Sequence, residues 1–360
     1  MNNIPMKTRS LKLLEFLSLE KSADRLLALE VPKDALSWTR FCGALLLVLV
    51  VLLFLSGIFM AFYYSPIPGT AYDSVDFALF NVPFGSVVKG VHHYSWNLLL
   101  MVMGVHLGRS LILGSYKAPR QMVWVTGVII LLFVPLFIIT GDLLPWDQKG
   151  YWSTQVRLSI ISSVPGMGHI AARLLQGGSL TGVVALTRFY VLHILMLPGL
   201  LVLLIAVHFH FIRHRGLSEP LGADPVSRPR IPFYPNVVNR WLFLFIMVSI
   251  ILGVISWHWI PPFGDPADPT DSSYIPKPEW WVLFLNQLVS VFKGGLAVLG
   301  STIIPAGLAG LLICLPFIDR SPHRHPARRW KILLPAAAIV IAILTLSIMG
   351  YMEHFVLVEN

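Results

Sequence analysis

The chain has 360 residues, of which 56% are hydrophobic and only 12% are charged, and its formal net charge is +9. A soluble domain is usually about one quarter charged, so this composition excludes an ordinary soluble enzyme and is typical of a multi-span membrane protein. The two cysteines, Cys42 and Cys314, both lie in apolar segments. They indicate neither a disulfide framework nor a zinc site.

The chain begins with a polar stretch in which leucines alternate with charged residues, and we expect residues 1–36 to form an N-terminal helix on the membrane surface. Seven segments after it are long and apolar enough to cross a bilayer, so we predict an all-α transmembrane protein with seven membrane-spanning helices. They are residues 37–63, 92–114, 122–141, 184–212, 240–260, 297–318 and 332–351. Three long connections, 64–91, 142–183 and 261–296, then lie on the same face.

Basic residues predict which face is inside. The connections on the N-terminal side of the membrane contain Arg109, Lys117, Arg120, Arg213, Arg215, Arg228, Arg230, Arg320, Arg324, Arg328, Arg329 and Lys331. By contrast, the outer segment 261–278 contains three aspartates, with Lys277 as its only Lys or Arg. This positive-inside bias predicts a cytoplasmic N-terminus and accounts for the positive net charge without a nucleic-acid partner.

Four histidines lie in two pairs on two of the predicted spans. His92 and His106 are 14 residues apart, and His193 and His208 are 15 apart. On a helix these separations correspond to about 21–22 Å of rise, and each returns to a similar face. The predicted topology makes the two spans parallel, so His92 meets His193 near the outer face and His106 meets His208 near the inner face. Two facing imidazoles can ligate a haem iron, so we predict a dihaem bundle.

Glycines on the two neighbouring spans repeat the same spacing. Gly43 and Gly57 are 14 residues apart, as are Gly127 and Gly141. Such positions could give clearance to a macrocycle, although glycine is also common where membrane helices simply pack closely. Three cations near the histidines could neutralise haem propionates: Lys89, Arg109 and Arg188.

Two outer segments are rich in aromatic residues and contain acids. Residues 140–152 read TGDLLPWDQKGYW, and residues 278–281 read PEWW. A carboxylate such as Glu279 at the edge of the apolar region could exchange a proton with a bound hydroquinone. The alternative is an interfacial aromatic belt that contains an incidental glutamate.

Together these segments resemble one family, the cytochrome b of quinol:cytochrome c (or plastocyanin) oxidoreductases. The matching stretches are FYYSP at 62–66, HLGRS at 106–110, GDLLPWDQKGYW at 141–152, RFYVLH at 188–193, HFHFIRHRG at 208–216 and PEWW at 278–281. The resemblance implies a b6-type four-helix dihaem domain over 37–218, joined to a subunit-IV-like three-helix domain over 219–360 that carries the PEWW loop.

The resemblance also implies cofactors, partners and sites. His92 and His193 would hold a low-potential haem b, and His106 and His208 a high-potential one. The complex would be a dimer in the plasma membrane of a prokaryote, with a Rieske iron–sulfur protein and a c-type cytochrome, and would contribute to a proton gradient by a Q cycle. Quinol would be oxidised outside and quinone reduced inside. The expected quinol-site residues are Pro278, Glu279, Trp280 and Trp281, with Glu279, Asp142 and Tyr151 as catalytic groups, and Arg213 for the inner quinone.

Three positions depart from the family pattern. Trp281 stands where the PEWY pattern has a tyrosine, and Asp142 stands where a tyrosine usually follows the glycine. Phe41, one residue before Cys42, aligns best with the haem-attaching cysteine of b6-type proteins, which argues against a covalently held third haem.

Two other classes of protein share part of this pattern. A dihaem membrane anchor of another quinone-linked oxidoreductase would have the four histidines but neither the PEWW nor the LPWDQ segment. A transporter could use intramembrane histidines to relay protons.

Overall fold

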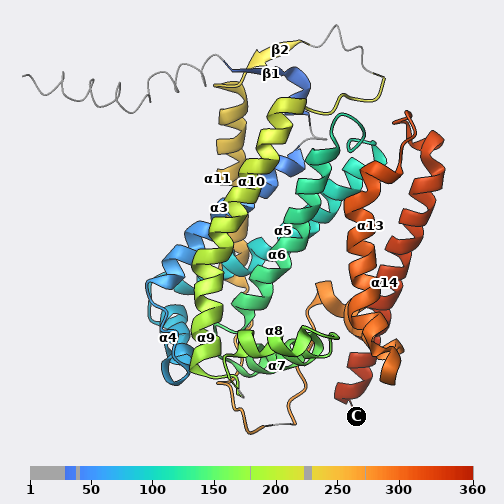
Figure 1. The fold of residues 1–360 in the computed structure, drawn as a ribbon. Helices are drawn as coiled ribbons and strands as arrows, with labels where there is room; N and C mark the ends of the chain where they lie inside the picture. Colours follow the sequence, from blue (N-terminus) through green and yellow to red (C-terminus); the bar gives the residue numbers. More distant parts are fainter. Residues whose placement is uncertain (1–28, 38–40, 179, 223–228, 272, 360) are drawn as a thin grey trace, which may run out of the picture.

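The computed structural model describes residues 29–37, 41–178, 180–222, 229–271 and 273–359. The predicted N-terminal surface helix therefore lies almost entirely outside the described residues. Among the described residues the regular secondary structure is helical apart from one short two-stranded ribbon and an isolated bridge between Asp147 and Pro266, which confirms the all-α class (Figure 1). The ribbon pairs β1 (Glu30–Pro32) with β2 (Arg230–Pro232) in antiparallel register, with Val31 opposite Ile231.

The long helices follow the predicted spans closely. They are α3 (Phe41–Ala61), α5 (Gly85–Ile112), α6 (Gln121–Asp142), α9 (Val183–Val191) continuing into α10 (Leu197–Arg215), α11 (Asn236–His258), α13 (Ile304–Ile318) and α14 (Trp330–Glu359). Shorter helices occupy the three long connections: α4 (Pro68–Phe80), α7 (Gln148–Ser162), α8 (Gly168–Gln176) and α12 (Leu283–Val291).

Six helices among the described residues are long and apolar enough to cross a membrane, one fewer than predicted. The difference concerns α5, which begins seven residues before the predicted start at 92 and extends over 28 residues. It is long enough to span, but Lys89, Asn97, Arg109 and its histidines lower its mean hydropathy. These polar groups are tolerated because α5 packs between α3 and α11, so that much of its surface faces protein.

Two wide turns interrupt the long helices, and each lies just before a proline. A π-helical turn at Leu192–Met196 joins α9 to α10 before Pro198, and another at Leu299–Ile303 leads into α13 before Pro305. Proline has no N–H and its ring collides with the carbonyl four residues earlier, so a wider turn relieves the crowding. Because a π turn holds one extra residue, the 15-residue interval from His193 to His208 has the register of a 14-residue interval.

The main apolar core joins α3, α5 and α11. Leu49 and Leu52 of α3, Leu99 of α5, and Val248 and Leu252 of α11 are among its buried residues. At Gly90 the helices α5 and α11 approach so closely that an added Cβ would lie 2.5 Å from the Ser256 Cβ. The first helix of the predicted C-terminal domain is therefore packed against the predicted dihaem bundle, although the division at 218/219 stays a prediction.

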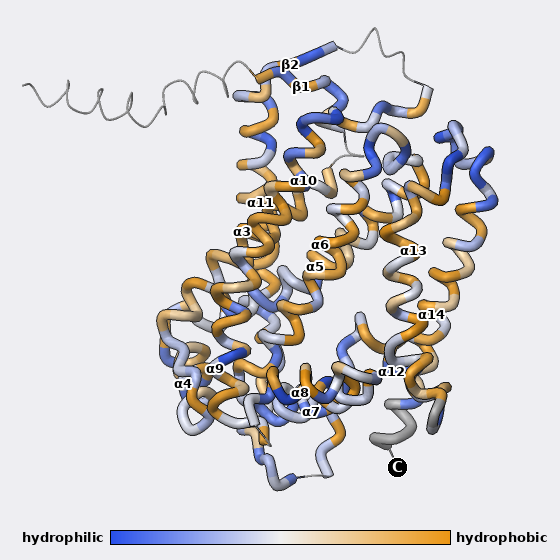
Figure 2. Tube along the Cα trace, in the orientation of Figure 1, coloured by the Kyte–Doolittle hydropathy of each residue, from blue (hydrophilic) through white to orange (hydrophobic). Residues whose placement is uncertain are grey.

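The long helices are mainly apolar, and polar residues collect at their two ends (Figure 2). One end, which we call the surface-helix end, holds α4, α7 and α8 (Figure 1). The opposite end, the ribbon end, holds β1, β2 and the basic connections at 113–120 and 319–329. Both α5 and the α9–α10 helix run from the surface-helix end to the ribbon end, so the predicted parallel arrangement is present.

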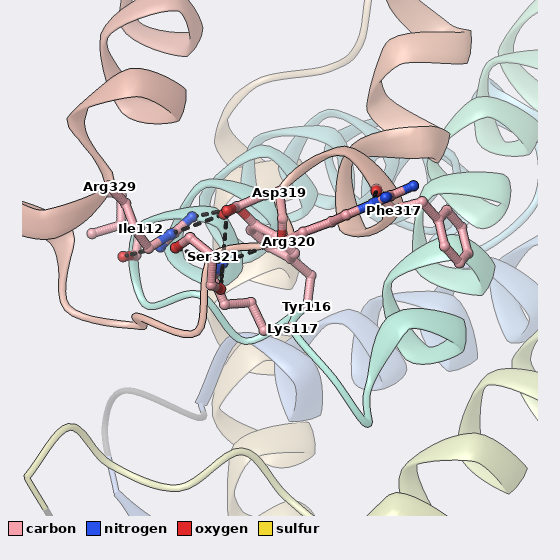
Figure 3. A network of polar contacts seen from close by, with 8 residues as sticks. All are labelled: Ile112, Tyr116, Lys117, Phe317, Asp319, Arg320, Ser321 and Arg329. Carbon is pink, nitrogen blue, oxygen red and sulfur yellow. Dashed lines mark hydrogen bonds and ion pairs between the residues drawn. The ribbon is translucent and has the colours of Figure 1, made fainter.

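A buried polar network at the ribbon end ties the α5–α6 connection to the α13–α14 connection (Figure 3). Asp319 accepts from Lys117 Nζ at 2.7 Å, from Arg329 Nε at 3.3 Å and from the Tyr116 hydroxyl at 2.6 Å. Lys117 also donates to the Ser321 carbonyl at 2.6 Å. The side chains of Asp319 and Arg329 are only 4% and 0% exposed, so one buried carboxylate holds two buried cations.

Candidate functional site

The four predicted histidines form two clusters at two depths of the bundle. At the surface-helix end, the ring of His92 on α5 lies 6.3 Å from the ring of His193, centroid to centroid. His193 itself lies in the π turn between α9 and α10. Towards the ribbon end, His106 of α5 and His208 of α10 are close enough to interact electrostatically. The spacing argument therefore paired the histidines as the structure has them.

Hydroxyl groups on the neighbouring helices contact three of the four imidazoles. Nδ1 of His92 lies 2.9 Å from Ser56 Oγ, Nδ1 of His208 lies 2.9 Å from Thr126 Oγ1, and Nδ1 of His193 lies 3.2 Å from Thr140 Oγ1. Each hydroxyl also donates its own proton to the carbonyl four residues earlier, at 2.6 to 2.8 Å.

This second bond decides the tautomer of the imidazoles. A hydroxyl has one proton, and here it is used on the helix backbone, so the hydroxyl oxygen must accept from the imidazole. Nδ1 therefore carries the proton, and Nε2 keeps a free lone pair, which is the form that ligates a metal. Among the described residues His106 has no such hydroxyl contact.

The hydroxyl residues were missed by the sequence analysis, although a signal for them exists. Each stands immediately before one of the spaced glycines, as Ser56-Gly57, Thr126-Gly127 and Thr140-Gly141, whereas Cys42 precedes Gly43. A serine or threonine next to a glycine that faces a histidine is a pattern that could be searched for in advance.

If His106 and His208 hold a haem as predicted, Thr126→Val should weaken its binding at the ribbon end about tenfold or more, since outer contacts of metal-ligating histidines commonly contribute that much. It should also raise the midpoint potential there, because loss of the Nδ1–H contact makes His208 a poorer donor to ferric iron. Redox titration of the b-type absorbance measures both effects. Thr126→Ser, which keeps the hydroxyl, should behave as the wild type; equal shifts in both variants would contradict this role.

Each spaced glycine lies against one histidine. An added Cβ would lie 3.8 Å from His106 Cε1 at Gly43, 3.4 Å from His92 Cε1 at Gly57, and 3.3 Å from His208 Cε1 at Gly127. At Gly141 it would lie only 2.6 Å from His193 Cε1. The four glycines therefore leave room for the imidazole rings themselves. This space fixes the position of each ring.

Two of the three predicted propionate partners are buried without a hydrogen-bond partner among the described residues. They are Lys89, whose Nζ lies 4.5 Å from the centre of the Phe263 ring, and Arg109, whose Nε is enclosed near the His106 end of α5. Arg188 differs, because its guanidinium donates to the Leu174 carbonyl in the last turn of α8. To neutralise a haem propionate, as predicted, the Arg188 guanidinium would have to share or give up this bond.

These observations fit two haems. Three of the four imidazoles present Nε2, and a glycine leaves room at the level of each histidine. A cation with a buried nitrogen that has no hydrogen-bond partner among the described residues lies three residues from His92 and another three residues from His106. Such cations are suited to bind the carboxylates of a cofactor, such as haem propionates.

The predicted quinol-site acids also lie at the surface-helix end, and cations of α7 hold both. Lys149 Nζ forms an ion pair with Glu279, and Arg157 NH2 lies 2.6 Å from Asp142 Oδ2. Burial would lower the pKa of Lys149, but the carboxylates of Asp142, Glu279 and Asp147 together raise it. Asp147 itself caps α7 by accepting from the Gly150 amide at 2.8 Å, and burial raises its pKa.

The other predicted site residues have different surroundings. Trp280 Nε1 donates to Asn97 Oδ1 at 2.7 Å, whereas the Trp281 indole N–H is buried without a partner among the described residues. Pro278 is half-buried directly before Glu279.

Tyr151 belongs to the apolar core of the surface-helix end. It is 5% exposed, and its ring packs edge-on against Trp146 and Trp152. Packing therefore accounts for its position, and its catalytic role stays a prediction. Arg213 is exposed at the ribbon end of α10, far along that helix from His193.

Comparisons with known proteins agree with this geometry. Residues 97–266 match the family model "Cytochrome b(N-terminal)/b6/petB". The chain is 34% identical over 301 residues to a cytochrome bc complex cytochrome b subunit of Chlorobaculum thiosulfatiphilum, covering 81% of this chain and 68% of that protein. It is 37% identical over 179 residues to a cytochrome b6 of Prochlorococcus marinus, covering 50% of this chain and 82% of that protein.

A solved structure titled "Hyperthermophilic respiratory Complex III" has the same fold. Its TM-score is 0.77 at 24% sequence identity, and the match covers 94% of this chain and 91% of that chain. The segment that matches the family model contains three of the four paired histidines, His106, His193 and His208. The chain therefore belongs to the cytochrome b family, as a cytochrome b subunit of a cytochrome bc-type complex.

Proposed function

We propose that this chain is the dihaem cytochrome b subunit of a quinol:cytochrome c oxidoreductase. It oxidises quinol at the surface-helix end and passes electrons across the membrane to a quinone site at the ribbon end. The observation that carries this proposal is the pair of imidazole clusters, stacked along two parallel helices with Nε2 free on at least three of the four rings.

Two haems b held by His92 with His193 and by His106 with His208 would supply one-electron transfer between the two faces. The chain's own residues prepare both places. Ser56, Thr126 and Thr140 orient the rings. Lys89 and Arg109 place a positive charge beside each pair, which favours bound carboxylates.

The surface-helix end is the proposed outer face. The basic connections gather at the ribbon end, and the positive-inside rule assigns that end to the cytoplasm. At the surface-helix end, Glu279 and Asp142 would bind quinol and accept its protons, with Trp280 and Trp281 bordering the ring. Arg213, exposed at the ribbon end, is the proposed inner quinone contact.

Assembly with a Rieske iron–sulfur protein and a c-type cytochrome, as a dimeric complex in a prokaryotic plasma membrane, completes the proposal. The Rieske partner would take one electron of each quinol, and the chain would carry the other, so that the complex contributes to a proton gradient. A third, covalent haem is not part of the proposal, because Phe41 stands at the attaching position.

We expect His208→Ala to reduce the haem content of the purified complex from two towards one and to abolish quinol oxidation. The reason is that one axial ligand is lost while the other pair stays intact. Pyridine haemochrome quantitation counts the haems, and reduced-minus-oxidised spectra identify the missing band. His210→Ala, two residues further along the same helix, is the matched control and should retain both haems. Unchanged haem absorbance and quinol oxidation in His208→Ala would overturn the proposal.

A further inference from the structure

The surface helix α7 carries two cations, and each is paired with an acid from a different part of the chain. Lys149 reaches Glu279, just before the short 3-10 turn Trp280–Val282, and Arg157 reaches Asp142, the last residue of α6. The carboxylate side chains are 15% and 16% exposed, so both acids are largely removed from water. Arg157 NH1 is also buried, with no hydrogen-bond partner among the described residues.

The two pairs form one charged cluster beside the His92–His193 pair. Lys149 interacts electrostatically with Asp142 and Asp147 in addition to Glu279. His93, next to His92 on α5, interacts with Glu279, Lys149 and Asp142. The groups facing Lys149 thus come from α6, from the start of α7 and from the segment before α12. Lys89 and His93 of α5, and Tyr274 of that segment, complete its charged and titratable surroundings.

A half-buried carboxylate can stay ionised only if a neighbouring charge offsets the loss of hydration. Oxidation of one quinol breaks two O–H bonds and releases two protons with two electrons. In the proposed function the electrons leave to the Rieske partner and to the nearer haem, so the protons need acceptors close to the quinol. The cluster has two carboxylates, each with its own cation.

We propose that Lys149 and Arg157 are positioning residues of the quinol-oxidation site, which hold the carboxylates of Glu279 and Asp142 in place by ion pairs. A carboxylate held in this way can take a quinol proton, forming a carboxylic acid, and later release it to the outer solvent. This inference rests on the proposed function, and it adds that α7 positions both acids. It also gives Asp142 a defined partner that sequence reasoning did not find.

Lys149→Met tests the proposal in the purified complex with a short-chain benzoquinol as substrate. Without its cation, the largely buried carboxylate of Glu279 loses the charge that offsets its lost hydration. The acid limb of the rate–pH profile should therefore move upward by about 1 unit or more. Lys149→Arg should restore the wild-type limb. Lys277→Met removes an exposed cation two residues before Glu279 and should leave the limb in place.

A second readout separates positioning from a general structural role. If Lys149 acts through Glu279, the upward shift should vanish in the Lys149→Met variant that also carries Glu279→Gln. Recorded across the acid limb, the infrared band of protonated carboxyl groups in the oxidised complex should rise at higher pH in the single variant than in the wild type or the double variant. A lower rate with an unmoved acid limb and no new carboxyl band would overturn the proposal. If instead the wild-type complex has two haems but oxidises no quinol, the proposed function fails.

Discussion

In the proposed dihaem complex, the Gly141→Ala variant should lose the haem at the surface-helix end and with it quinol oxidation. The added Cβ would lie 2.6 Å from Cε1 and 3.1 Å from Nδ1 of His193, closer than carbon atoms approach without displacement. The ring cannot turn away without leaving Thr140 Oγ1 and the Phe137 carbonyl, which hold Nδ1 at 3.2 and 3.1 Å. Haem counting on the purified complex should therefore fall from two to one.

The four glycines offer an internal series for this prediction. The clearances of 2.6 Å at Gly141, 3.3 Å at Gly127, 3.4 Å at Gly57 and 3.8 Å at Gly43 rank the expected damage from alanine in that order. Gly43→Ala should keep its haem, because 3.8 Å is ordinary van der Waals contact. Gly199→Ala on α10, which has no atom within 4 Å of the added Cβ, is the matched control. Equal haem loss at all four glycines would contradict a role in imidazole clearance.

The Asp319→Asn variant should detach the α13–α14 pair from the rest of the bundle far more readily than the wild type. It leaves the buried cations Lys117 and Arg329 without their counter-charge, and breaking a buried ion pair from one side costs about 3–5 kcal/mol. Thermal unfolding in detergent and limited proteolysis near residue 320 measure the loss. Arg320→Gln, an exposed neighbour, is the control and should leave both unchanged.

The same network predicts a dependence on pH. Burial would raise the pKa of Asp319, but hydrogen bonds from Lys117, Tyr116 and Arg329 outweigh it and lower that pKa. The stabilisation is therefore fully present above the ordinary pKa of an aspartate, about 4, and is lost as the pH falls through the lower folded value. Asp319→Asn should be insensitive to pH over this acid range. Adding Lys117→Met and Arg329→Met should recover part of its stability, because no unpaired buried charge would remain.

Much of the architecture followed from hydropathy and charge alone. Spans such as 122–141 and 240–260 match α6 and α11 to within four residues, because lipid demands long uninterrupted apolar helices. Histidine spacing and topology also paired His92 with His193, since depth in the membrane depends only on rise per residue and direction. The predicted start of α5 was wrong because the residues around Lys89 are polar. Hydropathy alone does not recognise the beginning of a helix that is covered by other helices.

The contacts between distant segments could not be predicted in the same way. Nothing in the sequence connects Lys149 with Glu279, or Lys117 with Asp319, because each pair is separated by at least 130 residues and is joined only by packing. Arg188 was predicted from its proximity to His193 to neutralise a haem propionate, and its bond to the Leu174 carbonyl was not foreseen, because sequence distance does not give side-chain direction. Tyr151 was predicted from its motif to be catalytic, and that motif did not indicate that its ring packs against two tryptophans.

The wide turn at Leu192–Met196 changes how helix length should be compared between relatives. A spacing of 14 or 15 residues between two histidines describes the same vertical separation when one helix contains a π turn and the other does not. A single-residue deletion inside 194–196 would therefore be absorbed by the turn, with His193 and His208 kept at their depths, whereas the same deletion between 199 and 207 would rotate His208 away from His106. Among members of this family, insertions and deletions should accordingly be more frequent at that turn than in the rest of the helix.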